Sequence, residues 1–414
     1  MRPGKSVSIR PSRGVGSIDG MRESPTAAAD ASESIPGPPP GPLPGARWIL
    51  GSAFAAFQPN RLVLGTFLAL LLGAIGALAD RIHDAAGARP VAAVEVIRGM
   101  RGDGTFIPDR AFADAGNGPA ASLAAAESMA ILGVVEGILG LEPRRAIDSV
   151  GDAVVRAPKA AFLAAPWTMT ALAIVWLAAA SLVGGALARA TALEAGRAVR
   201  IGARDAMASA LVRWKSLVFA PLLPFVGAAI CLVPIAILGL GFRLPVMDVL
   251  AAVLYAAALF LGFLATFLAI LGALALPLMP ASIACGDADA ADAFVRNAAY
   301  LVRAPFLWLG SVGVALVALA VGFAVAATFA GCTLGLTSLV AGWAAGGLGE
   351  DDGRSASAAA ILRLWDGTVR AILAGWIVSF LFEAATRIYL TLRVRCDGQD
   401  PSTLDGVPLS AGLR

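Results

Sequence analysis

The sequence predicts an all-α fold, a polytopic transmembrane helix bundle of about six spans with amphipathic interfacial helices. Hydrophobic residues make up 58% of the 414 residues and charged residues only 15%. Soluble domains carry about 25% charged residues, so this chain has too few charges to cover a water-exposed surface. Several apolar stretches reach the roughly 20 residues needed to cross a bilayer. We therefore expect lipid to surround most of the chain.

Composition and residue spacing exclude several classes of function. The net charge of +3 is too small to indicate nucleic-acid binding, and no basic run contains interleaved aromatic residues. The four cysteines are widely spaced and form no metal-binding motif, and His83 is the only histidine. No HExxH motif or GxSxG serine is present. We therefore expect a protein that is not an enzyme, with no catalytic residue, no metal and no cofactor.

The N-terminal region is predicted to be a tail followed by one span. Residues 1–60 are rich in proline and glycine and include a proline run, a composition that cannot bury a core. We expect a disordered cytoplasmic tail there. Residues 61–165 are predicted to hold the first span, at 62–79, and an extracytoplasmic segment after it. The region before this span is too long for a signal peptide, so an uncleaved anchor is expected.

The extracytoplasmic segment contains one ambiguous stretch, at 122–141. It is apolar for most of its length but carries Glu127 and Glu136, and each would cost about 2 to 3 kcal/mol at mid-membrane. We therefore expect a packed or interfacial helix rather than a span, although its entry into the membrane stays open.

Residues 166–396 are predicted to form a five-span membrane core with interfacial helices, and 397–414 a cytoplasmic tail. The five apolar stretches lie at about 166–188, 217–240, 249–278, 305–330 and 371–392. The apolar character after 305 continues to 345, where small residues recur on one helical face. One long or broken helix is favoured there. Two spans joined by a tight turn would raise the total to seven.

Basic residues in short loops predict the orientation. Between 189 and 215 the chain has six arginines and lysines, whereas the loop after the third span has only Arg243. Cytoplasmic loops carry an excess of Arg and Lys. The N-terminal tail, 189–215, 279–304 and the C-terminal tail are therefore predicted to be cytoplasmic.

The polar stretch at 287–303 is predicted to form an interfacial amphipathic helix. On a helical wheel, Asp292 and Arg296 fall on the polar side as an i,i+4 pair, with Tyr300 beside them. This helix is either a connector between two spans or a surface that binds a partner or a lipid head group. Asp292, Arg296 and Tyr300 are candidate functional or structural positions.

A second candidate is the pair of ionisable residues in the last span. Glu383 and Arg387 are four residues apart and can neutralise each other within the membrane. Ionisable residues inside a span are costly and often functional. The pair is either a self-contained ion pair that positions the helix or a polar patch in a substrate path.

The motifs DAFxRxxxYxxxxP and IYLxLRxxxDG, at 292–305 and 388–398, resemble an uncharacterised family of bacterial, planctomycete-like multi-pass membrane proteins. That family often reads DAFxxxSRSYxYxxxRP, and Asn297 stands where it usually has serine. The chain is also distantly similar to the membrane domain attached to some glycerophosphodiester phosphodiesterases. The resemblance implies a bacterial cytoplasmic (inner) membrane protein and implies no activity.

Two functions fit these sequence features. The first is a non-enzymatic scaffold or accessory protein, whose partners are the lipid bilayer and either another membrane protein or a second copy of the chain. The alternative is a permease-like transporter of a small or lipidic solute, with Glu383 and Arg387 in its path. An intramembrane hydrolase is least favoured, because the motifs such enzymes need are missing from the sequence.

Overall fold

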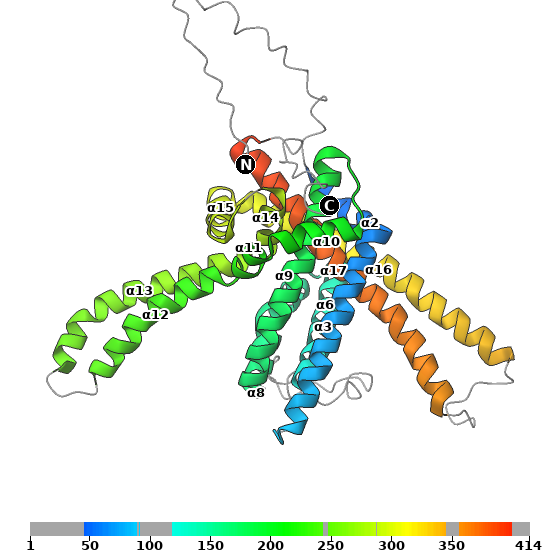
Figure 1. The fold of residues 1–414 in the computed structure, drawn as a ribbon, viewed down its shortest axis with the longest axis horizontal. Coiled ribbons are helices and arrows are strands. Elements are labelled where there is room, and N and C mark those ends of the chain that lie inside the picture. The colour runs from blue at the N-terminus through cyan, green and yellow to red at the C-terminus, as the bar shows by residue number, and fades with distance from the viewer. Residues whose placement is uncertain are drawn as a thin grey trace, which may run out of the picture. The chain divides into compact units, whose positions relative to one another are not determined.

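The computed structural model describes residues 45–88, 91, 118–242, 247–286, 288–344 and 356–399. Within these ranges the chain is helical and has no strand. An all-α helix bundle is therefore confirmed (Figure 1). The helices are α1 (Ala46–Leu50), α2 (Ser52–Ala55), α3 (Pro59–Ala85), α6 (Pro119–Leu139), α7 (Pro143–Gly151), the π-helix η1 (Asp152–Arg156), α8 (Ala157–Ala164), α9 (Pro166–Arg197), α10 (Ala203–Val212), α11 (Trp214–Phe219), α12 (Leu223–Gly241), α13 (Met247–Ala275), the 3-10 helix η2 (Leu276–Leu278), α14 (Met279–Cys285), α15 (Ala290–Arg303), α16 (Pro305–Ala344) and α17 (Ala356–Asp397).

Seven helical segments of the described residues are long and apolar enough to cross a membrane. Six of them overlap the six predicted spans, and the seventh is α6. The stretch after 305 is one continuous helix, α16, so the alternative of two spans there is wrong. The span predicted from 217 begins only at Leu223, because Trp214–Phe219 forms the separate helix α11 and prolines follow at 221 and 224. The chain is thus a multi-pass membrane protein.

Part of the region predicted to be a disordered tail, residues 45–60, is folded in the structure. Residues 1–44 lie outside the described part, but α1 and α2 fold before α3. Their residues Ile49, Ala53 and Ala56 are buried in the main hydrophobic cluster, together with residues of α16 and α17. These apolar contacts stabilise helices in a segment whose composition alone indicated disorder.

The centre of the fold is formed by α3, α9 and α17, with α3 antiparallel to both other helices. Arg61 at the start of α3 contacts Glu194 near the end of α9, whereas His83 near the end of α3 contacts Thr168 at the start of α9 (Nδ1 to Oγ1, 2.9 Å). Arg61 also contacts Glu383 of α17. Each of these contacts joins residues distant in the sequence, so the centre is held by tertiary packing.

A helical hairpin lies against this centre. It starts with α6 and returns through α7, η1 and α8. The return segment runs antiparallel along α6. An added Cβ at Gly137 would lie 2.5 Å from the backbone N of Ala146, and one at Gly133 would lie 2.4 Å from Ser149 Oγ. Farther along, Ala157 and Ala161 are buried with Leu123 and Ala126. The segment expected to be one packed or interfacial helix is therefore half of a hairpin that begins and ends near the same end of α3.

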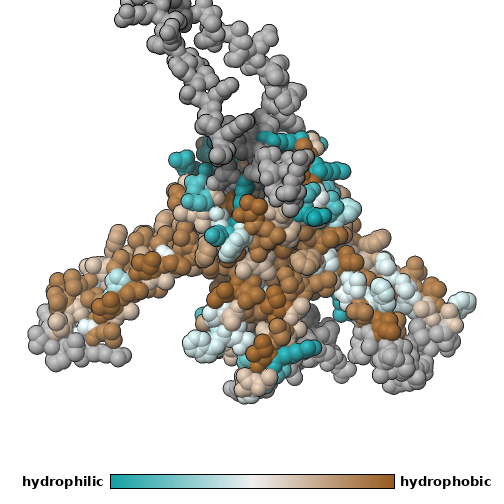
Figure 2. Space-filling view, viewed as in Figure 1, coloured by the Kyte–Doolittle hydropathy of each residue, from teal (hydrophilic) through white to brown (hydrophobic). Residues whose placement is uncertain are grey.

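Hydrophobic surface covers the sides of the long helices, and hydrophilic residues gather near α10 and α15 (Figure 2). On α12 and α13, large apolar side chains such as Ile230, Val253 and Phe263 are exposed. Exposed apolar side chains at this density match a hydrocarbon environment. The fold thus has the surface expected of a protein in contact with the bilayer.

Asp80 joins α3 to the start of the hairpin, and its removal is expected to loosen that start. Its carboxylate accepts hydrogen bonds from the backbone N–H groups of Ala120 (2.8 Å) and Ala121 (3.0 Å). The preceding Gly118 has φ 155°, and a Cβ there would lie 2.4 Å from Asp80 Cγ, so the close approach requires glycine.

We expect Asp80→Ala to cost about 1 kcal/mol, as for loss of a helix N-cap. Hydrogen exchange at the Ala120 and Ala121 amides should accelerate, because these donors lose their acceptor. Asp84→Ala, at an exposed position on the same helix, is the matched control. Equal exchange in the two variants would show that Asp80 does not hold α6.

Candidate functional site

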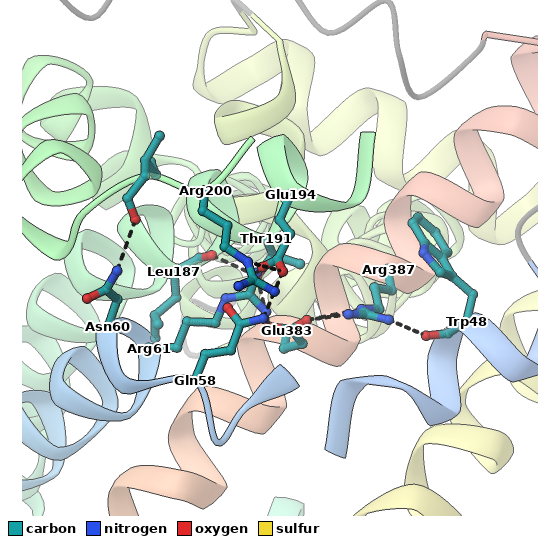
Figure 3. A network of polar contacts seen from close by, with 11 residues as sticks. Trp48, Gln58, Asn60, Arg61, Leu187, Thr191, Glu194, Arg200, Glu383 and Arg387 are labelled. Atoms are coloured by element: carbon teal, nitrogen blue, oxygen red, sulfur yellow. Dashed lines mark hydrogen bonds and ion pairs between the residues drawn. The ribbon is translucent and has the colours of Figure 1, made fainter. Parts of the chain in front are cut away.

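Four charged residues from three helices form the candidate site, which we term the central charge network: Arg61, Glu194, Glu383 and Arg387. Arg61 makes ion pairs with both Glu194 and Glu383 (Figure 3). Glu383 also pairs with Arg387, whose Nη2 lies 2.7 Å from its carboxylate. These four residues carry two positive and two negative charges, and Glu194 makes a further ion pair with the exposed Arg200 (3.0 Å).

Glu383 lies at the centre of this network and its side chain is only 1% exposed. Its carboxylate accepts hydrogen bonds from Arg61 Nη1, Thr191 Oγ1 (3.2 Å), and Arg387 Nε (3.0 Å) and Nη2 (2.7 Å). The three N–H donors of Arg61 and Arg387 are charge-assisted, whereas the single Thr191 hydroxyl proton is shared with the Leu187 carbonyl (2.9 Å). A buried charge is tolerated when it is paired and hydrogen-bonded in this way.

Arg387 and Glu194, at the two ends of the network, contact further segments of the chain. Arg387 Nη1 donates to the backbone O of Trp48 (2.5 Å), and its guanidinium lies 5.7 Å from the Trp48 ring centroid. Glu194 accepts from Gln58 Nε2 (2.8 Å) and from the exposed Arg200 (Nε, 3.0 Å). The network thus fixes α1, the start of α3, the end of α9 and the last part of α17 against one another.

One small cavity adjoins the outer side of the network. A cavity of about 30 Å³ is lined by Arg61 and Glu194 together with residues of α3, α9 and α10, and its lining does not include Glu383. Such a volume holds about one water molecule. The Glu383 carboxylate therefore lies outside the lining of this cavity.

The predicted pair of Glu383 and Arg387 forms, but it is not self-contained. Sequence reasoning missed Arg61 and Glu194, which fell outside the predicted spans. Two signals could have indicated them. Arg61 immediately precedes an apolar stretch, and Glu194 is the one acid between Arg189 and Arg204.

The other candidates lie on α15, which has the predicted polar pair but begins at Ala290, three residues after the predicted start at 287. Asp289 caps the helix by accepting from the Asp292 N–H (2.8 Å), and Arg296 Nη2 lies 3.0 Å from Asp292 Oδ2. Pro305 begins the next helix, as expected. Asp292 and Arg296 are both partly exposed, so this pair remains accessible at the surface.

Tyr300 differs from the expectation, because it points into the protein. It is 1% exposed, donates a hydrogen bond to Asp397 at the end of α17, and lies 6.0 Å from the Tyr389 ring centroid. Burial raises the pKa of the Tyr300 phenol above its usual range, and the bond to the Asp397 carboxylate raises it further. Tyr300 therefore anchors α15 to α17 and is not available for docking. Asn297 is also buried and donates to Ser282 Oγ (3.1 Å).

Three arginines hold the last turn of α14, which precedes α15. The carbonyls of Ile283, Ala284 and Cys285 accept hydrogen bonds from Arg213, Arg189 and Arg393, respectively. Positive side chains stabilise the negative end of a helix. The candidates on α15 and the central charge network thus contact different parts of α17 and form two separate sites.

The charges described here form no metal site. Among the described residues, no group of three or more His, Cys, Asp or Glu side chains could hold a metal ion.

Comparison with known proteins gives no match to a family model, a curated protein or a solved structure.

Proposed function

We propose that this chain is a non-enzymatic integral membrane scaffold or accessory protein. The observation that supports this proposal best is the central charge network, in which Glu383 is buried, fully hydrogen-bonded and balanced by Arg61 and Arg387. A buried network of this kind contributes more to a defined arrangement of helices than to net stability. We interpret it as the rigid centre of the protein.

The exposed apolar surfaces of α12 and α13 are suited to partner contacts within the membrane. Only 11% of residues are buried in the most apolar window of α12, and only 17% in that of the segment Leu250–Cys285, which includes most of α13. The two helices also enclose an apolar groove of about 600 Å³, lined by Pro234, Ile237, Leu250 and Leu254 among others. Another membrane protein or a second copy of the chain could cover the pair α12 and α13, with lipid covering the remaining apolar surface.

Two observations support an orientation with both termini in the cytoplasm. The segments before α3 and the end of α17 lie together, as the contact of Trp48 with Arg387 indicates. Six arginines and lysines between 189 and 215 lie in and around α10 and α11, which supports a cytoplasmic position for that end. We place both termini in the cytoplasm and the protein in a bacterial inner membrane, the latter on the resemblance of its motifs alone.

The permease-like alternative is less well supported. It needs water or solute to reach Glu383, and transporter sites are usually built around broken helices at mid-depth. The small cavity beside Arg61 does not include Glu383 in its lining, and α17 is continuous through this position.

Site-specific photo-crosslinking in native membranes tests the scaffold proposal. A photoreactive residue replacing Phe260, which is 66% exposed on α13, should give a discrete adduct with another polypeptide chain. The matched control replaces Ala265, which is 5% exposed on the same helix, and should give no such adduct. Adducts with lipid alone at Phe260, together with solute uptake by vesicles containing the purified protein, would favour the permease.

A further inference from the structure

The return segment of the hairpin, α7 to α8, has its apolar side turned away from the protein. Ile147 is 71%, Val154 65% and Leu163 69% exposed, and Val155 and Phe162 are exposed with them. Spacings of seven and eight residues place such side chains on one side of a helix. A helix in water would present its charged side outward, so this pattern indicates a helix that faces hydrocarbon.

The charged side chains of the same segment line a groove against α6. The groove has a volume of about 890 Å³ and is lined by Met129, Leu132, Gly133, Glu136, Glu142, Pro143, Arg144, Arg145, Asp148, Ser149 and Asp152. Ligand pockets have volumes of about 300 to 1,000 Å³. Ionisable residues at membrane depth normally face a polar cavity, and this groove provides one.

Two ordered features line this groove. Asp152 is 7% exposed and is held by Arg156 (2.6 Å), at the start of the π-helix η1. Single π-helical turns within α-helices often occur at functional sites. Ser149, which also lines the groove, is buried against Gly133. The groove therefore has an ordered, charged floor.

The charges available in the groove are of both signs. Arg145 is already paired with Glu136 and lies 3.8 Å from Glu142. Within the described part of the chain, the side chains of Arg144 and Asp148 form no ion pair or hydrogen bond with another residue. One guanidinium and one carboxylate are thus free to meet a ligand that carries a phosphate and an ammonium group.

We propose that the groove between α6 and α7 binds the head group of a zwitterionic phospholipid. Arg144 contacts the phosphate, since guanidinium groups match phosphate oxygens well, and Asp148 contacts the ammonium group. The apolar side chains of Met129 and Leu132 face the start of the acyl chains. The lining has four acids against two arginines, which disfavours an anionic lipid.

Photolabelling tests the proposal. The full-length protein in non-ionic detergent is labelled with a phosphatidylethanolamine that carries a photoreactive group near the glycerol, and adducts are mapped by mass spectrometry. We expect adducts within residues 119–164. Unlabelled phosphatidylethanolamine should compete at about ten-fold lower concentration than phosphatidylglycerol, the difference expected from one charge-assisted contact.

The double variant Arg144→Ala, Asp148→Ala should reduce labelling by about ten-fold. The control Lys159→Ala, at an exposed position of α8 outside the groove lining, should leave it unchanged. Adducts of the unmodified protein elsewhere, equal competition by phosphatidylglycerol, or full labelling of a folded double variant would each overturn the proposal. Competition by soluble glycerophosphoethanolamine as strong as that by the intact lipid would also overturn it.

Discussion

Replacing Glu383 by glutamine is expected to lower the free energy of unfolding by about 3 to 5 kcal/mol, as for loss of one partner from a buried ion pair. The substitution keeps the shape of the side chain but removes the negative charge between Arg61 and Arg387. Arg61, which is 2% exposed, would keep only Glu194 as a partner, and Arg387 would lose its ion pair altogether. Unfolding in mixed micelles of increasing sodium dodecyl sulfate content measures the effect.

Glu194→Gln is the matched control. Its carboxylate is 21% exposed, and Arg61 would keep Glu383 as its partner. We therefore expect a loss less than half as large. Equal losses in the two variants would contradict a network organised around Glu383. Replacing Arg61 by methionine and Glu383 by leucine together should recover much of the stability, because apolar residues often substitute well for a complete buried pair.

The sequence predicted features that depend on local pattern. The i,i+4 pairs of Asp292 with Arg296 and of Glu383 with Arg387 both form as expected, because four residues make one helical turn. The six predicted spans are also present, since each is a long uninterrupted apolar run. Features of this kind need no knowledge of the tertiary arrangement.

Features that depend on contacts between distant segments were not predictable in this way. Arg61 lies 133 residues from Glu194 and 322 from Glu383, so no local pattern links them. Tyr300 was placed beside the polar face of α15, yet its contact with Asp397 turns it inward. The two glutamates of α6 argued against a span, and only the antiparallel return segment shows that Glu136 faces a charged groove.

Gly375→Ala is expected to destabilise the crossing of α3 and α17 by about 1 to 3 kcal/mol, as for other overpacked contacts. A Cβ at Gly375 would lie 2.3 Å from Thr66 Oγ1 and 2.5 Å from the Thr66 Cα and N. Backbone atoms cannot move aside as a side chain can, so the helices must separate. Unfolding in sodium dodecyl sulfate micelles measures the loss. Gly310→Ala is the control, since a Cβ there meets nothing within 4 Å, and we expect a change within about 0.5 kcal/mol.

The same crossing should connect Gly375 to the central charge network. Gly65, which packs against Gly375, lies one helical turn from Arg61, so separating the helices also lengthens the contact between Arg61 and Glu383. The double variant Gly375→Ala, Glu383→Gln should therefore lose less stability than the sum of the two single losses, as for residues that share one structural contact. Strict additivity would mean that the glycine contact and the charge network hold α3 and α17 together independently.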